Sequence, residues 1–290
     1  MQNTDNYSRI IAGTMTWGSW GKKLSKREIV DLMNFCVENG ITTFDHADIY
    51  GDYTTEGDFG AALIESGIKR EAIQLISKCG IQRVSRKENR IPHYEYSKEY
   101  IIWSAEESLK KLKSEYLDLL LLHRPSPLMH PDEIGEAINQ LLATGKIKSF
   151  GVSNFTTSQI AMLEKNIPVS ANQVEFSLTH DAPMYDGTFD DCILHERLAM
   201  AWSPLGIVFR DDNPQTKRVK EKLSELAGKY NVEESQLLLA WILKHPSRVH
   251  PVIGTTNKDR IVLSAKTESI NLELQDWFEL LKASQGHIVP

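Results

Sequence analysis

A short apolar run followed by a longer segment of helical period occurs eight times along the chain. The apolar runs predict strands at residues 10–15, 41–44, 73–77, 117–122, 149–152, 171–174, 198–202 and 249–253. These runs are nearly continuous rather than alternating, which indicates strands that are buried on both faces. Parallel sheets covered by helices have strands of this kind, so the pattern favours an α/β fold.

The segments between the runs predict helices at residues 26–39, 56–66, 98–112, 131–144, 157–165, 190–195, 217–229, 234–244, 259–264 and 274–283. The first of them has Ser25 as its N-cap and Gly40 beyond its end. Each strand-then-helix unit takes roughly 30 to 40 residues, the length expected of a βαβ repeat.

Eight such units in a chain of 290 residues match a TIM barrel. The alternative is a doubly wound sheet, which usually needs a glycine-rich turn to hold a dinucleotide, and no G-x-G-x-x-G occurs in the sequence. No linker or low-complexity segment interrupts the pattern. We therefore expect an α/β protein with one (β/α)8 barrel domain spanning residues 1–290.

Charge and cysteine content limit the partners and the compartment. The formal net charge of −6 gives no basic footprint for nucleic acid or an anionic membrane. No apolar run approaches the roughly 20 residues of a membrane span, and the polar segment 1–9 lacks the apolar core of a signal peptide. Cys36, Cys79 and Cys192 show no C-x-x-C spacing, which argues against a disulfide framework or thiolate zinc site and favours the cytoplasm.

Four side chains of complementary chemistry follow consecutive predicted strands. Asp45 ends the second strand, Tyr50 lies in the loop after it, and Lys78 and His123 end the third and fourth. Because a barrel gathers the carboxyl ends of its strands at one mouth, we expect these four to meet. A Lys ammonium lowers the pKa of a nearby phenol, a carboxylate keeps that Lys charged, and a neutral imidazole can orient a carbonyl oxygen. The set predicts a phenol that acts as general acid toward a carbonyl, whereas any one member alone could be structural.

This order of residues resembles the catalytic tetrad of the aldo-keto reductases. Similar motifs continue along the chain as GVSNF at 151–155, NQVEFS at 172–177, WSPLG at 202–206 and VIGTTNKDR at 252–260. The resemblance covers essentially the whole chain. It implies a (β/α)8 barrel that reduces aldehydes and ketones to alcohols with NADPH, with Tyr50 as the general acid and a small-molecule carbonyl as the partner.

The resemblance also implies which residues bind the nicotinamide cofactor, without a Rossmann domain. Ser153, Asn154 and Gln173 match positions that bind the carboxamide, and Trp202 matches the position that stacks on the nicotinamide ring. Ser203, Leu205 and Gly206 match the segment beside the pyrophosphate, while Thr255 and Arg260 match positions that bind the 2′-phosphate. The implied set is completed by Gly13, Thr14, Met15, Asp45 and Gly254. A 2′-phosphate site with an arginine favours NADPH over NADH.

Three departures from the family pattern bear on this cofactor assignment. His46 follows Asp45 where many members have Thr, and it either packs outside the barrel or lies near the cofactor. Gly254 replaces a basic residue that many members place on the 2′-phosphate. Leu263 and Ser264 stand where many members have Glu-Asn to hold the adenine.

The substrate side carries less information. Trp17, Trp20 and Tyr53 in the first two loops are candidate substrate residues together with His123, and ordinary surface packing is the alternative for the three aromatics. The short loop 124–130 and tail 284–290 predict an open site that accepts varied carbonyls. The basic stretch around residues 83–90 is predicted to be a solvated loop.

A second class of function is compatible with the same residues. Proteins similar to this family serve as cytoplasmic β-subunits of potassium channels, so the alternative is a cofactor-binding regulatory or sensor subunit with little turnover. The sequence contains no H-E-x-x-H motif and no Cys/His spacing that would predict a metal site. The sequence is compatible with a monomer but does not specify the oligomeric state, the physiological substrate or the direction of reaction.

Overall fold

The computed structural model describes residues 6–86 and 88–288, so parts of the N-terminal segment and of the tail lie outside it. A closed parallel barrel forms its centre. The strands in their order around the barrel are β1 (Ile11–Gly13), β2 (Thr43–Asp45), β3 (Gln74–Cys79), β6 (Leu119–Leu122), β7 (Phe150–Ser153), β8 (Ala171–Glu175), β9 (Leu198–Trp202) and β10 (His250–Ile253). Pairing of β1 with β10 closes the ring. The predicted (β/α)8 barrel is confirmed, and each barrel strand lies within or overlaps a predicted apolar run.

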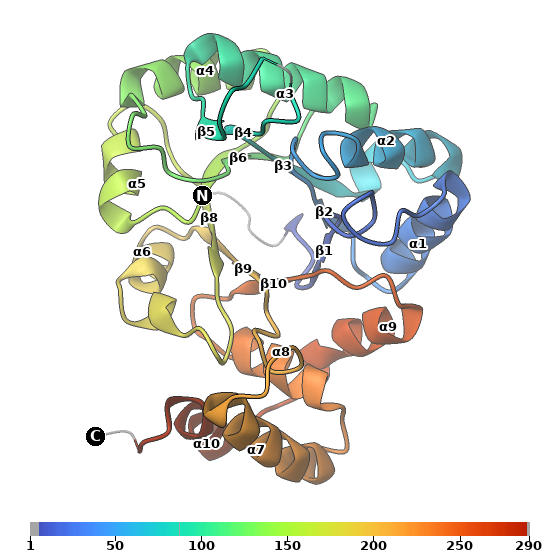
Figure 1. Ribbon diagram of the computed structural model, residues 1–290, viewed down its shortest axis with the longest axis vertical. Helices are drawn as coiled ribbons and strands as arrows, with labels where there is room; N and C mark the ends of the chain where they lie inside the picture. Colours follow the sequence, from blue (N-terminus) through green and yellow to red (C-terminus); the bar gives the residue numbers. More distant parts are fainter. Residues whose placement is uncertain (1–5, 87, 289–290) are drawn as a thin grey trace.

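Helices surround the barrel (Figure 1). They are α1 (Lys26–Glu38), α2 (Thr55–Ser66), α3 (Lys98–Leu112), α4 (Pro131–Ala143), α5 (Thr157–Leu163), α6 (Thr188–Leu194), α7 (Pro214–Tyr230), α8 (Glu234–Leu243), α9 (Lys258–Lys266) and α10 (Leu274–Gln285). Short 3-10 turns lie at Arg70–Ala72, Ala182–Met184 and Thr267–Ser269. Helix α1 begins after the predicted cap Ser25, which forms a capping box with Glu28.

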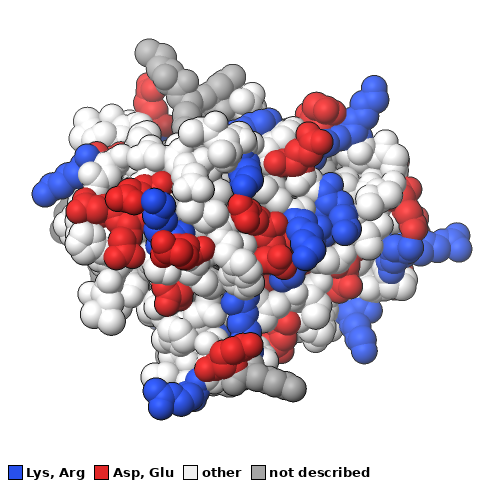
Figure 2. Space-filling model, turned by 90° about the horizontal axis from the view of Figure 1, so that it is seen from above, with Lys and Arg blue, Asp and Glu red and all other residues white. Residues whose placement is uncertain are grey.

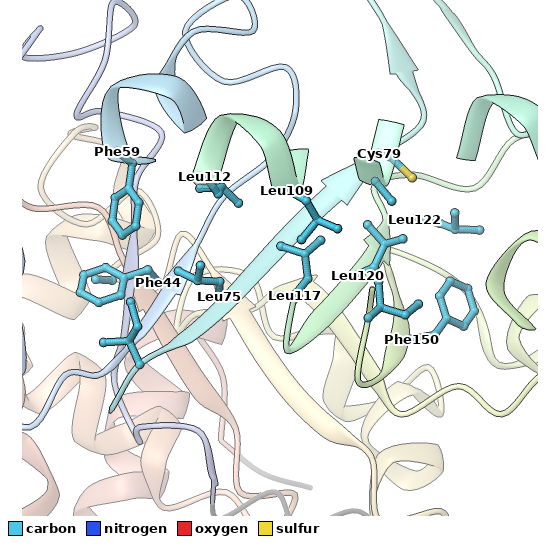
Figure 3. Close-up of a cluster of buried hydrophobic side chains, with 14 of the residues drawn as sticks. Phe44, Phe59, Leu75, Cys79, Leu109, Leu112, Leu117, Leu120, Leu122 and Phe150 are labelled. Atoms are coloured by element: carbon cyan, nitrogen blue, oxygen red, sulfur yellow. The ribbon is translucent and has the colours of Figure 1, made fainter. Parts of the chain in front are cut away.

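Both faces of the barrel strands are buried, which explains the continuous apolar runs. Successive side chains of a strand point to opposite faces, so in β3 Ile76 packs inside the barrel while Leu75 packs under the helices. Figure 3 shows the outer layer, in which Phe44 and Leu75 lie near Phe59 of α2. Toward α3 the layer continues with Leu109, Leu112, Leu117, Leu120, Leu122 and Phe150.

One element departs from the sequence prediction. Strands β4 (Ile81–Gln82) and β5 (His93–Tyr94) form a two-stranded antiparallel hairpin between β3 and α3. Its basic side chains are not simply solvated, because the guanidinium of Arg83 lies 4.6 Å from the centre of the Trp20 ring and that of Arg86 lies 4.1 Å from the centre of the Tyr53 ring. The predicted solvated loop is therefore wrong for these two arginines.

The surface agrees with the balanced charge of the chain. On the face shown in Figure 2, acidic and basic side chains are interspersed and no broad field of one sign appears. Within the described residues, no helix combines the length and the apolar character needed to cross a bilayer.

Candidate active site

The strand register brings the predicted catalytic residues to one mouth of the barrel. Asp45 at the end of β2 lies between Gly13 of β1 and Ile76 of β3. Lys78 lies near the end of β3, beside Leu121 of β6. Because all these strands are parallel, their carboxyl ends open toward the same side, and His123 and Tyr50 follow there in the next loops.

The Lys78 ammonium is the centre of the site. Its Nζ donates to both carboxylate oxygens of Asp45, at 2.8 and 2.7 Å, and to the carbonyl of His46 at 2.8 Å. It also lies 3.2 Å from the hydroxyl of Tyr50. Burial alone would lower the pKa of Lys78, but the charge of Asp45 and the Tyr50 hydroxyl outweigh that effect and raise it. Lys78 therefore stays protonated at neutral pH.

The Tyr50 phenol is held in its protonated form. Burial raises its pKa, the positive charge of Lys78 lowers it, and the negative charge of Asp45 raises it again, so that the pKa lies above 10.0. The expected net lowering by Lys78 is therefore not found, because loss of solvent around the hydroxyl outweighs the ammonium. Lys78 still lies where it would stabilise a phenolate formed by proton release.

His123 faces Tyr50 in an edge-on arrangement, with ring centres 6.1 Å apart. Burial, the charge of Lys78 and the charge of Arg124 hold the His123 pKa well below its usual value. The imidazole is therefore neutral. Its Nδ1 is buried and has no hydrogen-bond partner among the described residues, so no protein contact at Nδ1 fixes the tautomer.

The residues predicted to hold the nicotinamide carboxamide form one network with Asp45. The Gln173 amide donates to Asp45 Oδ1 at 3.1 Å, and its backbone carbonyl accepts from Ser153 Oγ at 2.8 Å. Asn154 donates to Ser153 Oγ at 2.8 Å and accepts from the Trp202 indole at 2.9 Å. The network joins the ends of β2, β7, β8 and β9. The contact of Gln173 with the Asp45 carboxylate was not predicted from the sequence.

Left-handed backbone marks the predicted pyrophosphate segment. Ser203 has φ +51° and Gly206 has φ +55°. A Cβ on Gly206 would lie 2.6 Å from Ser177 Oγ and still closer to Thr179, so this position requires glycine for space as well as for conformation.

Arg260 lies in the first turn of α9, the helix that follows β10. Asn257 caps this helix and accepts from the Arg260 backbone N at 3.0 Å. The Arg260 side chain is exposed, and Thr255 is partly exposed beside it. A helix N-terminus with a guanidinium favours a phosphate group, so these residues fit a 2′-phosphate.

Two predicted site residues turn away from the mouth. Trp17 is only 1% exposed and packs edge-on against Phe44 and tilted against Phe59. It is therefore a core residue and not a wall of the substrate site. Thr14, predicted to touch the cofactor, is fully buried, and its hydroxyl donates to the Asp45 carbonyl at 3.0 Å.

His46 packs outside the barrel, the first of its two alternatives. Its Nδ1 lies 2.9 Å from the Thr14 hydroxyl and its ring stands edge-on to Phe59, 4.3 Å between centres. Burial and the charge of Lys78 lower its pKa to about 3. The side chain is a neutral packing group, while its backbone carbonyl supports Lys78.

Two aromatic residues predicted for the substrate site remain near the mouth. The Trp20 ring lies 6.2 Å from that of Tyr50. Tyr53 lies three residues after Tyr50, and its hydroxyl accepts from the Arg83 backbone N at 3.1 Å. Met15 is 46% exposed, which leaves it accessible at the end of β1. Gly13 at that strand end would bring a Cβ to 3.0 Å from Val252.

A pocket of about 530 Å³ opens beside Trp202 and Asn154. Its polar wall includes Arg124, Glu175, His180 and Asp186. Sequence reasoning missed these residues, although Arg124 directly follows His123. The wall can offer hydrogen bonds of both polarities to a polar ligand.

Two buried carboxyl groups next to β3, those of Asp48 and Glu56, were not predicted from the sequence. Asp48 accepts from Ser104 at 3.1 Å and Tyr100 at 3.2 Å, and its backbone N donates to the Lys78 carbonyl at 3.0 Å. Burial and the nearby Glu56 raise the pKa of Asp48 to about 7. No sequence signal distinguishes these acids from solvated ones.

Across residues 6–86 and 88–288, no three His, Cys, Asp or Glu side chains gather in a way that could hold a metal ion.

Comparisons with known proteins show the family of the chain. The chain is 40% identical to the oxidoreductase YdhF of Escherichia coli (strain K12), over 98% of this chain and 96% of that protein. It is 34% identical to a 6-dehydroglucose reductase of Agrobacterium fabrum, over 96% and 95% of the two chains.

The same relation appears among solved structures. An aldo/keto reductase from Klebsiella pneumoniae, solved with NADP and acetate, is 25% identical and superimposes with a TM-score of 0.78 over 98% of this chain and 93% of its own. The family model of the aldo/keto reductases matches residues 9–284. The resemblance that the sequence motifs suggested is thereby confirmed, and the chain belongs to the aldo/keto reductase family.

Proposed function

We propose that this protein reduces aldehydes and ketones to alcohols with NADPH, and that Tyr50 is the general acid. One observation carries the proposal: the Lys78 ammonium contacts both oxygens of Asp45 and the hydroxyl of Tyr50 at the mouth of the barrel. Membership of an oxidoreductase family supports the reaction class.

Bound NADPH would supply the hydride that reduces the carbonyl carbon. The chain supplies the proton and the orientation. Because the pKa of Tyr50 is raised, the phenol carries its proton at neutral pH and can donate it to the carbonyl oxygen. Lys78 then stabilises the phenolate, Asp45 keeps Lys78 charged, and neutral His123 can donate a hydrogen bond to the same oxygen. The reverse sequence would oxidise an alcohol.

The proposed cofactor residues follow one side of the mouth. Ser153, Asn154 and Gln173 offer amide and hydroxyl groups suited to a carboxamide, and Trp202 offers a flat face for a ring. Exposed Arg260 at the start of α9 supports a preference for the 2′-phosphate of NADPH. The neighbour from Klebsiella pneumoniae was solved with NADP, which is consistent with this choice.

The pocket beside Trp202 has no tetrad residue in its lining, but it begins at Arg124, directly after His123. As an extension of the substrate site, its polar wall would favour carbonyl substrates that carry hydroxyl groups. Arg124 and His180 can donate hydrogen bonds, whereas Glu175 and Asp186 can accept them. A sugar-derived carbonyl has both kinds of group, and one relative is named a 6-dehydroglucose reductase. We therefore include hydroxylated aldehydes and oxo-sugars among the candidate substrates.

A cytoplasmic location remains part of the proposal. Three free, buried cysteines support a reducing compartment. The alternative of a sensor subunit with little turnover has no specific observation in its favour.

Steady-state oxidation of NADPH with a panel of small, aromatic and hydroxylated aldehydes tests the proposal. We expect turnover with several members of the panel, and NADH should support it less well. Tight NADPH binding with negligible turnover across the panel would instead favour the sensor alternative.

A further inference from the structure

The turn directly after Tyr50 has an unusual backbone. Gly51, Asp52 and Tyr53 have φ values of +59°, +54° and +71°, so three successive residues are left-handed. Two of them are not glycine, and residues with a Cβ occupy this region only when their surroundings hold them there. The source of that restraint is therefore informative about the site.

Hydrogen bonds within the turn restrain it locally, as where Thr54 Oγ1 donates to the Gly51 carbonyl at 2.8 Å, and the β4–β5 hairpin adds restraint from outside. Arg83 forms an ion pair with Asp52, with Nε and Oδ1 2.8 Å apart, and its backbone N donates to the Tyr53 hydroxyl at 3.1 Å. The guanidinium of Arg86 lies 4.1 Å from the centre of the Tyr53 ring. Both non-glycine residues of the left-handed turn are thus held by side chains or backbone of the hairpin.

Arg83 also lies over the Trp20 ring. The guanidinium carbon of Arg83 lies 4.6 Å from the centre of the indole, within the range of a cation–π contact. The indole in turn lies 6.2 Å from the Tyr50 ring, inclined by 59°. A continuous series of contacts therefore runs from the hairpin through Trp20 to the catalytic phenol.

We propose that Arg83 is a positioning residue of the substrate site. It holds the Trp20 indole beside Tyr50 and fixes the turn that follows Tyr50, so the hairpin forms the outer wall of the site. The inference rests on the proposed function for its kinetic consequences. Flat carbonyl substrates such as aromatic aldehydes, which would lie along the indole, depend on this wall more than propanal does.

The alternative is that the hairpin contributes stability alone. The side chains of Arg83 and Asp52 are 41% and 45% exposed, and ion pairs exposed to this degree contribute little to folding. Removing Arg83 should therefore leave the melting temperature nearly unchanged and yet release the Trp20 indole.

The kinetic test compares Arg83→Ala, Trp20→Ala and the double variant, using NADPH with benzaldehyde and with propanal. We expect Arg83→Ala to lower kcat/KM for benzaldehyde by at least about fivefold, mainly through KM, and to affect propanal less. Because both residues act through one wall, the double variant should lie within about twofold of Trp20→Ala. Arg83→Lys, which keeps the charge near Asp52 but lacks the planar group, should recover part of the loss.

Arg90→Ala is the matched control. Arg90 is exposed in the same connection and makes no hydrogen bond or ion pair with the described residues. Its loss should leave kcat/KM and NADPH affinity within about twofold of the parent. Equal kinetics for Arg83→Ala and Arg90→Ala, or losses of Arg83→Ala and Trp20→Ala that multiply in the double variant, would overturn the proposal.

A second measurement does not need turnover. Acrylamide quenching of tryptophan fluorescence should increase in Arg83→Ala, and that increase should vanish when Trp20 is already Phe, because Trp20 is the ring that Arg83 covers. An increase that persists without Trp20 would also overturn the proposal. This readout remains valid even if the parent protein reduces none of the aldehydes, which would refute the proposed function instead.

Discussion

Substitutions in the buried ion pair of Lys78 and Asp45 should affect stability and catalysis in different ways. The two side chains are 1% and 3% exposed, so water cannot replace a missing partner. Lys78→Met would leave the Asp45 carboxylate with the Gln173 amide at 3.1 Å. Asp45→Asn would leave the ammonium with neutral groups, including the carbonyl of His46 at 2.8 Å. Each single variant therefore buries an unpaired charge, whereas the double variant buries none.

The expected magnitudes follow from this difference. Removing one member of a buried ion pair costs roughly 3–5 kcal/mol in the free energy of unfolding. Removing both avoids the unpaired charge, so the double variant should be more stable than either single variant, with a coupling of about 2–3 kcal/mol. Turnover should not recover, because a phenolate without its ammonium loses roughly 100-fold or more in rate.

The assay is urea unfolding at neutral pH for the parent and the three variants, with single-turnover reduction of one aldehyde on the same samples. Neutral pH is appropriate because the pKa of Lys78 is raised above 10.5 in the folded protein. Its contribution is therefore fully present there and is lost only as the pH rises through that raised value. Stability losses that add in the double variant, or turnover that returns with stability, would refute the reasoning.

Three further outcomes are expected. Arg260→Ala should weaken NADPH binding about tenfold and leave NADH binding nearly unchanged, as fluorescence titration would show, and equal effects on both cofactors would contradict the 2′-phosphate role. Since burial raises the pKa of Asp48 from 3.8 to about 7, stability should fall as the pH rises through that interval, and urea unfolding of Asp48→Asn should show a flatter dependence. A slope that does not change would assign the effect to other groups. Gly206→Ala should lower the melting temperature because Gly206 has φ +55° and its added Cβ would be crowded by Ser177. Gly254→Ala is the control and should leave the melting temperature unchanged, since no atom lies within 4 Å of its added Cβ. Similar melting temperatures for the two variants would contradict the conformational requirement for glycine at position 206.

The barrel and the meeting of Asp45, Tyr50, Lys78 and His123 could be predicted because they depend on simple periodic rules. Leu75 and Ile76 are adjacent, face opposite sides of one strand, and are both buried, which is why the run containing them is apolar throughout. Asp45 and Lys78 meet because parallel strands end at the same mouth. Neither feature depends on the detailed packing of side chains.

Features set by distant packing could not be predicted. Trp17 and Trp20 are three residues apart in one loop, and contacts with Phe44 and Phe59 from other segments decide that Trp17 enters the core. The pKa of Tyr50 depends on how much solvent the folded mouth excludes, which composition does not reveal. The β4–β5 hairpin could not be predicted because each of its strands has two residues, and both residues of β5 are exposed.

Single-turnover reduction by Tyr50→Phe tests the central claim most directly, since this change removes one hydroxyl and keeps the ring. We expect the rate of the reduction step to fall by roughly 10²–10⁴-fold while the NADPH dissociation constant stays within about twofold of the parent value. A reduction rate equal to that of the parent would contradict the assignment of Tyr50 as the general acid.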